Sequence, residues 1–296
     1  MPRVAWTGRH PSLSVALARR IPDCLAAPDP LDRADLRSFL RETSPELVIH
    51  TISRPLGIGG RREHPEDDLH DALAGGSALL HEARLAGVKK IALVGSIVAY
   101  PEFAPSPLRE QDLENGPAEL ASATVAGPVR AMLAQTRAAR QQGIDAILLL
   151  SATIYGPGDD MDRERGHVIP ALIAKFAGAR DEGESRVTLW GEGNATREFV
   201  YAGDAAEMIL AAAEQWSSPD PLNLGSGWEI PIADLALKIA AKIGYPGKMN
   251  WDRARPTGPP RRRLDLSRAT ELGIRAKTTL DAGLDETIAW YESTRN

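Results

Sequence analysis

Short apolar runs alternate with longer amphipathic stretches through the first half of the chain. The apolar runs predict buried strands at residues 3–6, 23–26, 47–52, 90–95 and 145–150. The amphipathic stretches predict helices at residues 11–20, 31–41, 67–86 and 128–142. Strands that alternate with helices of this length indicate an α/β fold with a doubly wound, parallel sheet of the Rossmann type and right-handed crossovers.

The pattern changes after residue 151, where loops lengthen and helices no longer alternate with strands. Here the sequence predicts strands at residues 186–190 and 222–224, and helices at residues 205–215, 232–243 and 284–291. One loop, at residues 155–170, follows the apolar run that ends at residue 150. Because open α/β sheets bind ligands at the carboxyl ends of their strands, we expect this loop to belong to a site.

The amino-acid composition of the chain limits the kinds of partner that we expect it to bind. The chain has 296 residues, 43% of them apolar, and a net charge of −5, so the molecule as a whole offers no basic footprint for nucleic acid or an acidic membrane. Its one cysteine, Cys24, excludes an intramolecular disulfide and a thiolate metal site. The sequence shows neither a secretory signal pattern nor an apolar run of about 20 residues, so we expect a cytoplasmic protein.

Several segments carry a family resemblance. Segment 155–160 reads Tyr-Gly-Pro-Gly-Asp-Asp, segment 167–172 reads His-Val-Ile-Pro-Ala-Leu, and segment 223–227 reads Asn-Leu-Gly-Ser-Gly. Together with segments 187–193 and 255–265, they resemble the GDP-L-fucose synthases. These are extended short-chain dehydrogenase/reductases of the NAD-dependent epimerase/dehydratase type, which epimerise and reduce a GDP-keto-deoxyhexose.

The resemblance implies a domain organisation and a cofactor. Residues 1–151 would form the dinucleotide-binding domain. Residues 152–296 would form mainly a smaller substrate-binding lobe, with segments that return to the main domain. The implied cofactor is NADP or NAD.

The glycine-rich turn after the first strand is altered. Of the three glycines that such a turn uses to approach a pyrophosphate, only Gly8 is present, while Pro11 and Ser14 stand at the other two positions. Proline suits a first helical turn but has no N–H to donate, so we expect weakened pyrophosphate binding.

Charged residues near this turn leave the coenzyme open. Asp29 and Asp32 are placed to bind an adenosine ribose, which favours NAD, whereas Arg9 and His10 favour a 2′-phosphate and thus NADP. Alternatively, Gly8 is an ordinary turn residue and the two aspartates cap the next helix.

The family's catalytic residues are only partly kept. Segment 95–101 reads Gly-Ser-Ile-Val-Ala-Tyr-Pro, and the resemblance assigns Ser96 as the catalytic serine. The family's Tyr-x-x-x-Lys pair falls on Thr124 and Pro128, and no Tyr-x-x-x-Lys occurs in the chain. Because a proline removes a helical hydrogen bond, we expect the helix to begin near Pro128.

The family's epimerase pair is also incomplete. Val98 stands at the cysteine position, whereas the resemblance keeps His167 as the remaining acid/base, with a structural role at the helix start as the alternative. Thr124 is a candidate for the position of the missing tyrosine. Tyr100 is a further candidate proton donor, against a packing role after the strand.

The C-terminal half suggests a sugar-nucleotide site. The resemblance places Lys175, Trp190, Arg197, Arg255 and Arg261 at the substrate. Arginines bind phosphates through paired, charge-assisted hydrogen bonds, and a tryptophan can bound a sugar or base. The alternative is a solvated arginine cluster and a core tryptophan.

We therefore expect an NAD(P)-dependent enzyme that modifies a nucleotide sugar or related nucleoside, with an atypical active site. The alternatives are a catalytically silent nucleotide-sugar-binding protein and a non-redox enzyme that uses the sugar pocket without a dinucleotide. The resemblance also implies a homodimer that packs the helices at residues 67–86 and 128–142. No metal, nucleic acid or membrane partner is expected.

Overall fold

The computed structural model describes residues 3–57, 59–60, 63–117, 123–255 and 257–295. Its centre is a six-stranded parallel sheet with the strand order β10-β5-β4-β3-β1-β2. The strands are β1 (Val4–Thr7), β2 (Leu25–Ala26), β3 (Leu47–Thr51), β4 (Lys90–Ser96), β5 (Asp145–Ser151) and β10 (Leu222–Leu224). The predicted Rossmann-type α/β fold is confirmed.

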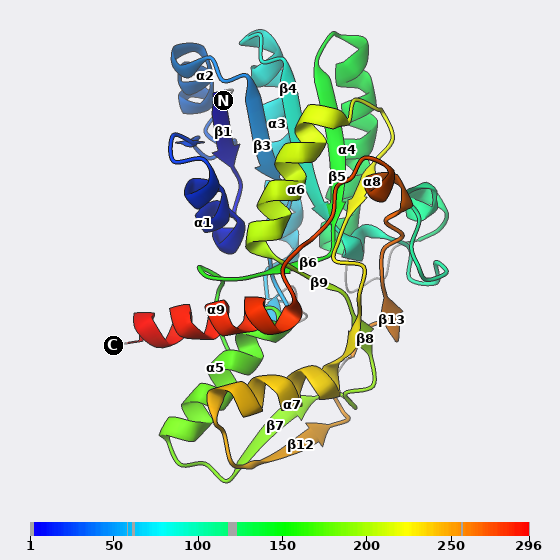
Figure 1. Cartoon of the computed structure of the whole chain (residues 1–296). Coiled ribbons are helices and arrows are strands. Elements are labelled where there is room, and N and C mark those ends of the chain that lie inside the picture. The colour runs from blue at the N-terminus through cyan, green and yellow to red at the C-terminus, as the bar shows by residue number, and fades with distance from the viewer. Residues whose placement is uncertain (1–2, 58, 61–62, 118–122, 256, 296) are drawn as a thin grey trace.

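Helices cover both faces of this sheet (Figure 1). One face carries α1 and α6, which pack together, and the other carries α2, α3 and α4. Their bounds are α1 (Pro11–Arg20), α2 (Arg33–Thr43), α3 (Pro65–Leu85), α4 (Ala123–Gln141) and α6 (Ala202–Gln215). The shorter helical elements are η2 (Ile97–Ala99), η3 (Glu110–Glu114) and α8 (Ser267–Glu271).

The start of α4 differs from the prediction. The chain is already helical at Ala123, and Pro128 lies inside the helix. Although a proline within a helix costs about 3 kcal/mol, this one is offset by packing, because Val125, Val129 and Met132 on the same helix are buried. Tertiary burial thus overrides the local helix-breaking signal.

A second hydrophobic core lies beyond the carboxyl ends of the main strands, in the lower part of Figure 1. Its main elements are α5 (Val168–Asp181), α7 (Ile232–Ile243), α9 (Leu280–Thr294), and the parallel pair β7 (Arg186–Trp190) and β12 (Lys248–Asp252). The buried side chains of Phe176, Leu189 and Ile239 belong to this core. We call this part of the molecule the lobe.

Short strands connect the lobe to the main sheet. They are β6 (Thr153–Tyr155) with β9 (Phe199–Tyr201), and β8 (Thr196–Arg197) with β11 (Ile230–Pro231) and β13 (Arg261–Arg262). After this excursion, α6 and β10 return to the main domain, where β10 pairs with β5. Within the described residues, no helix is both long and apolar enough to cross a bilayer.

Candidate active site

Three neighbouring pockets follow the carboxyl ends of the main strands. The N-terminal pocket, about 180 Å³, lies between the ends of β1 and β3 and the first turns of α3. The central pocket, about 50 Å³, lies at the ends of β4 and β5, and the lobe pocket, about 240 Å³, extends from there between α5 and β7. Thr51 and Arg54 line the first two pockets, and Ser96 and His167 line the last two. The pockets therefore form one continuous site.

Gly8 lets the backbone approach closely in the N-terminal pocket. Its φ of +117° lies in a region that residues with a Cβ rarely adopt. A Cβ added there would lie 2.8 Å from the backbone nitrogen of Thr51 and closer still to its hydroxyl. The turn therefore needs glycine at this position, as the sequence predicts for a dinucleotide-binding turn.

Five charged side chains surround the mouth of the N-terminal pocket. Arg9 pairs with Asp29 at 2.7 Å and with Asp71 at 3.0 Å. Arg54 lies 3.5 Å from Asp71 and 3.7 Å from Asp68. We call these five residues the charge ring. Of the residues that the sequence predicts at the cofactor, Gly8, Arg9 and Asp29 are brought together here.

The floor of this pocket carries buried polar atoms. His50 is 4% exposed, and neither of its ring nitrogens has a hydrogen-bond partner among the described residues. The buried hydroxyl of Thr51 likewise has none there. Burial lowers the pKa of His50 to about 4, so the ring is neutral at neutral pH. A polar floor beneath a glycine turn fits the polar groups of a nucleotide.

Two predicted cofactor residues lie elsewhere. Asp32 is the N-cap of α2, where its side chain accepts a hydrogen bond from the backbone N–H of Asp35 at 3.1 Å. It is not among the residues that line the N-terminal pocket, so the capping interpretation applies. His10 is the residue before α1, and it faces the central pocket rather than a 2′-phosphate site. Its Nδ1 lies 3.3 Å from Oγ of Ser12, and burial lowers its pKa to about 4.

Ser96 and His167 both line the central pocket and the lobe pocket. Ser96 ends β4, and its Oγ accepts a hydrogen bond from the backbone N–H of Val98 at 3.4 Å. His167 is the residue before α5 and is half-buried. The structure thus places both predicted residues in the lining of the same pockets, and their catalytic roles stay predictions.

Neither candidate for the missing tyrosine is placed at this site. Thr124 is not among the lining residues of the central pocket, whereas its neighbour Val125 is. Tyr100 is fully buried, and its hydroxyl donates to Oδ1 of Asn223 at 2.6 Å. Burial, with the nearby Glu110 carboxylate, holds the pKa of Tyr100 well above its ordinary value. Tyr100 is therefore a packing residue.

Cationic groups bracket one tryptophan at the lobe pocket. Nζ of Lys175 lies 5.7 Å from the centre of the Trp190 ring, and the guanidinium of Arg255 lies 4.8 Å from it. Lys175 also forms an ion pair with Glu164 at 3.0 Å. Lys175 and Trp190 line the pocket, whereas Arg255 is not among the lining residues.

The two arginines of β13, Arg261 and Arg262, lie in different surroundings, because successive side chains of a strand point to opposite faces. Arg261 is half-exposed and its guanidinium is held by both carboxylate oxygens of Glu229, away from the pocket lining. Its neighbour Arg262 is 5% exposed, lines the pocket, and donates to the carbonyl of Ile97 at 3.0 Å. The sequence prediction that Arg261 binds substrate stays a prediction, but its neighbour Arg262 is the arginine of β13 that lines the pocket, and alternation within a strand is the signal that was available to find it.

One predicted residue and its neighbour in sequence form part of the lobe-pocket wall, Arg197 and Glu198. Arg197 lines the lobe pocket and donates to the carbonyls of Thr196 at 2.7 Å and Thr257 at 2.9 Å. The sequence assigned no role to Glu198, which is buried against it. The carboxylate of Glu198 accepts from the backbone N–H groups of Leu264 and Gly227 at 2.7 and 2.9 Å, which ties three segments of the wall together.

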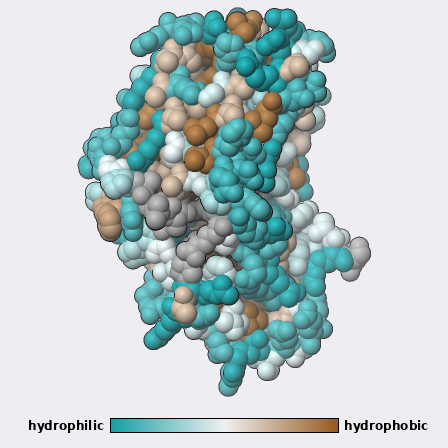
Figure 2. Space-filling view, turned by 180° about the vertical axis from the view of Figure 1, so that it is seen from behind, coloured by the Kyte–Doolittle hydropathy of each residue, from teal (hydrophilic) through white to brown (hydrophobic). Residues whose placement is uncertain are grey.

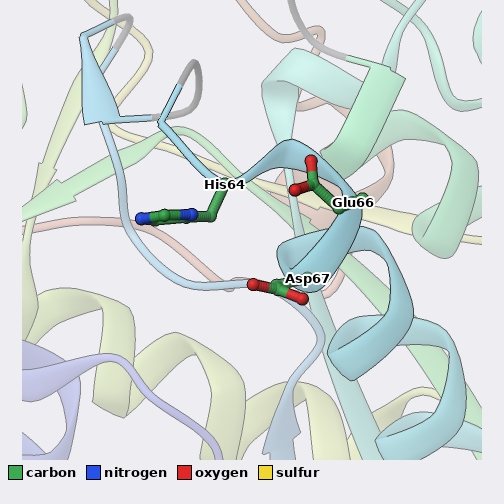
Figure 3. A group of neighbouring side chains, drawn as sticks. All are labelled: His64, Glu66 and Asp67. Carbon is green, nitrogen blue, oxygen red and sulfur yellow. The ribbon is translucent and has the colours of Figure 1, made fainter.

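One surface group has the composition of a metal site. His64, Glu66 and Asp67, at the start of α3, place their ligand atoms within 4.8 Å of one another (Figure 3). All three are exposed, and no second feature marks the group as a site.

Comparison with known proteins identifies similar sequences and folds. The sequence model of the NAD dependent epimerase/dehydratase family matches residues 6–225. GDP-L-fucose synthase 1 of Arabidopsis thaliana is 34% identical over 260 residues, which cover 88% of this chain and 80% of that protein. A GDP-6-OMe-4-keto-L-xylo-heptose reductase from C. jejuni has a TM-score of 0.89 at 23% identity and covers 100% of this chain and 99% of its own. A GDP-L-fucose synthetase from Naegleria fowleri, bound to NADP, has a TM-score of 0.86 at 20% identity over 99% and 95% of the two chains.

Proposed function

Since the chain belongs to the NAD dependent epimerase/dehydratase family, we propose that it is a nucleotide-sugar epimerase/reductase that uses NAD(P) and a GDP-sugar. The dinucleotide would occupy the N-terminal and central pockets, and the nucleotide sugar would occupy the lobe pocket. The observation that carries this proposal is the position of Ser96 and His167 at the junction of the last two pockets.

The N-terminal and central pockets fit a dinucleotide in their chemistry. Gly8 admits a close approach, and His50 and Thr51 present buried polar atoms that the described protein groups leave unbonded. When bound, NAD(P) would supply or accept a hydride. The residues of this chain would orient the coenzyme and handle protons.

Ser96 and His167 have separate tasks in this proposal. The hydroxyl of Ser96 would donate a hydrogen bond to the keto oxygen of the sugar. The imidazole of His167 would take a proton from, or return one to, the carbon beside that keto group. With Val98 at the family's cysteine position and Val125 facing the central pocket, His167 is the principal acid/base of this assignment.

The lobe pocket suits an anionic substrate. Its lining holds four basic side chains and two carboxylates, so the basic groups are in excess, and two tryptophans also line it. The basic residues are Arg163, Lys175, Arg197 and Arg262, the carboxylates are Glu164 and Glu198, and the tryptophans are Trp190 and Trp251. Guanidinium groups bind diphosphates by charge-assisted hydrogen bonds, which are about twice as strong as neutral ones. We therefore assign the diphosphate of the substrate to this pocket.

One observation favours a second candidate function. Val125 lines the central pocket, next in sequence to Thr124, the position on which the resemblance places the family's tyrosine. A protein that binds nucleotide sugars without turnover would need no proton donor there.

Calorimetry followed by a turnover assay separates these functions. The protein is titrated with GDP and with NADH or NADPH, and then a GDP-keto-deoxyhexose is added while the loss of reduced coenzyme is followed. Binding of both ligands with turnover is the expected result. Binding without turnover would leave the silent binder, and GDP binding without coenzyme binding would leave a non-redox enzyme.

We also propose a homodimer that packs through α3 and α4. Figure 2 shows the face opposite α1 and α6, where hydrophobic residues appear among hydrophilic ones in the upper half. Light scattering of the purified protein tests this, with a monomer mass as the opposing result.

The single cysteine supports a reducing compartment such as the cytoplasm.

A further inference from the structure

The charge ring of the N-terminal pocket has more carboxylates than guanidinium groups. Three carboxylates, those of Asp29, Asp68 and Asp71, face the two guanidinium groups of Arg9 and Arg54, which gives the ring a formal charge of −1. His50 adds no positive charge at neutral pH, because burial lowers its pKa to about 4. The pocket therefore offers no surplus cation.

Each arginine of the ring is already engaged. Arg9 directs Nη2 to Asp29 and Nη1 to Asp71, at 2.7 and 3.0 Å. Arg54 shares Asp71 and also faces Asp68. A guanidinium has five N–H donors, so either arginine could also reach a phosphate, but that phosphate would then lie beside the carboxylates that the arginine already contacts.

Asp29 is positioned to accept hydrogen bonds from a ribose. Its Oδ1 accepts the backbone N–H of Leu31 at 3.0 Å, and its Oδ2 accepts from Arg9, which together fix the plane of the carboxylate. A carboxylate has about four acceptor positions, so two remain for other donors. The side chain is 45% exposed and lines the pocket.

These observations bear on the choice between NAD(H) and NADP(H), which differ by one phosphate group on the adenosine ribose. A ribose 2′-hydroxyl donates to a carboxylate, whereas a 2′-phosphate carries a charge of about −1.5 to −2 and is repelled by it. We infer that the N-terminal pocket selects NAD(H) over NADP(H), with Asp29 and Asp71 as the residues that determine this specificity. The inference rests on the proposed function, and it differs from the NADP bound by the similar Naegleria fowleri structure.

Direct binding measurements test the selection without relying on turnover. Dissociation constants of NADH and NADPH are measured by coenzyme fluorescence at fixed ionic strength, because salt screens these partly exposed charges. We expect NADH to bind about tenfold more tightly, the factor that about 1.4 kcal/mol of repulsion would give. NADPH binding that equals or exceeds NADH binding would overturn the inference while leaving the proposed function intact.

Two variants identify the residues responsible. In Asp71→Asn, Arg9 loses one carboxylate partner, so NADPH should gain about tenfold relative to NADH. In Asp29→Asn the same ratio should shift at least as far, because the repelling charge beside the ribose is removed. Ratios unchanged from the wild type in both variants would overturn the assignment of these residues.

Asp32→Asn is the matched control. It removes the same charge three residues from Asp29, and asparagine keeps the helix cap on α2. The NADH-to-NADPH ratio should stay at the wild-type value. If neither coenzyme binds the wild-type protein, both the selection and the proposed dinucleotide function are overturned, which distinguishes that failure from a preference for NADPH.

Discussion

The two ends of the site hold their charges in opposite ways. In the N-terminal pocket, Arg9 and Arg54 are outnumbered by three carboxylates, and the buried His50 below them is neutral. In the lobe pocket, the basic side chains, which include Arg197 and Arg262, outnumber the carboxylates of the lining. One end thus suits a neutral diol, and the other suits a diphosphate.

The two pockets also differ in the elements that hold their charged side chains. The charge ring takes its side chains from four segments, which are the three that follow β1, β2 and β3 and the first turns of α3. The lobe pocket instead arranges its cations on short strands that Glu198 ties to neighbouring segments. Substitutions at the junction of Ser96 and His167, in the N-terminal pocket and in the lobe pocket should therefore change the protein in ways that can be measured separately.

The largest expected effect is at the junction between the two ends. We expect His167→Ala to lower turnover by about two to four orders of magnitude, because a general acid/base contributes that much. GDP and coenzyme binding should remain within about threefold of the wild type, since the cations of the lobe pocket and the charge ring are untouched. Initial rates and calorimetry measure the two quantities. A His167→Ala variant with wild-type turnover would remove His167 from the mechanism.

The next effect concerns acid stability at the N-terminal end. The pKa of His50 is about 4 in the folded protein, against an ordinary value of 6.5. Because the unfolded chain binds the proton more readily, the contribution of His50 to stability is complete above pH 6.5 and is lost as the pH falls to about 4. The shift corresponds to about 3 kcal/mol in the free energy of unfolding.

His50→Gln should reduce this dependence without abolishing it, whatever its own starting stability, because burial also lowers the pKa of His10 to about 4. Urea unfolding between pH 4 and 7 gives the slope for the wild type and the variant. His70→Gln, at a side chain that is 74% exposed, is the matched control and should keep the wild-type slope. Equal slopes for His50→Gln and the wild type would mean that His50 is not held neutral by the fold.

Much of the main sheet could be predicted from the sequence. The apolar runs predicted five of its six strands to within about a residue. β3 and β5 illustrate why, because a strand buried on both faces reads as a continuous apolar run. The start of α4 could not be predicted, because Pro128 is a local signal and the burial of Val129 that offsets it is a tertiary contact.

The candidate site, like the fold, could be predicted only in part from the sequence. Ser96 and His167 could be found because each stands in a motif at the end of a strand or the start of a helix. The directions in which neighbouring side chains point could not be predicted from the sequence. Whether Arg9 or His10 faces the ribose side depends on the turn at Gly8, which no local pattern of the sequence specifies.

The smallest expected effect separates two arginines of the lobe end. Arg197→Ala should weaken GDP-sugar binding by about 1.5–3 kcal/mol, the contribution of a hydrogen bond to a charged group. Arg261→Ala should change binding by less than about 1 kcal/mol, because Arg261 is half-exposed and already paired with Glu229, and exposed ion pairs contribute little. Calorimetric titration with GDP measures both, and circular dichroism verifies folding. If Arg261→Ala weakened binding as much as Arg197→Ala, Arg261 would have to leave Glu229 to reach the substrate, and the division of the two arginines by strand alternation would fail.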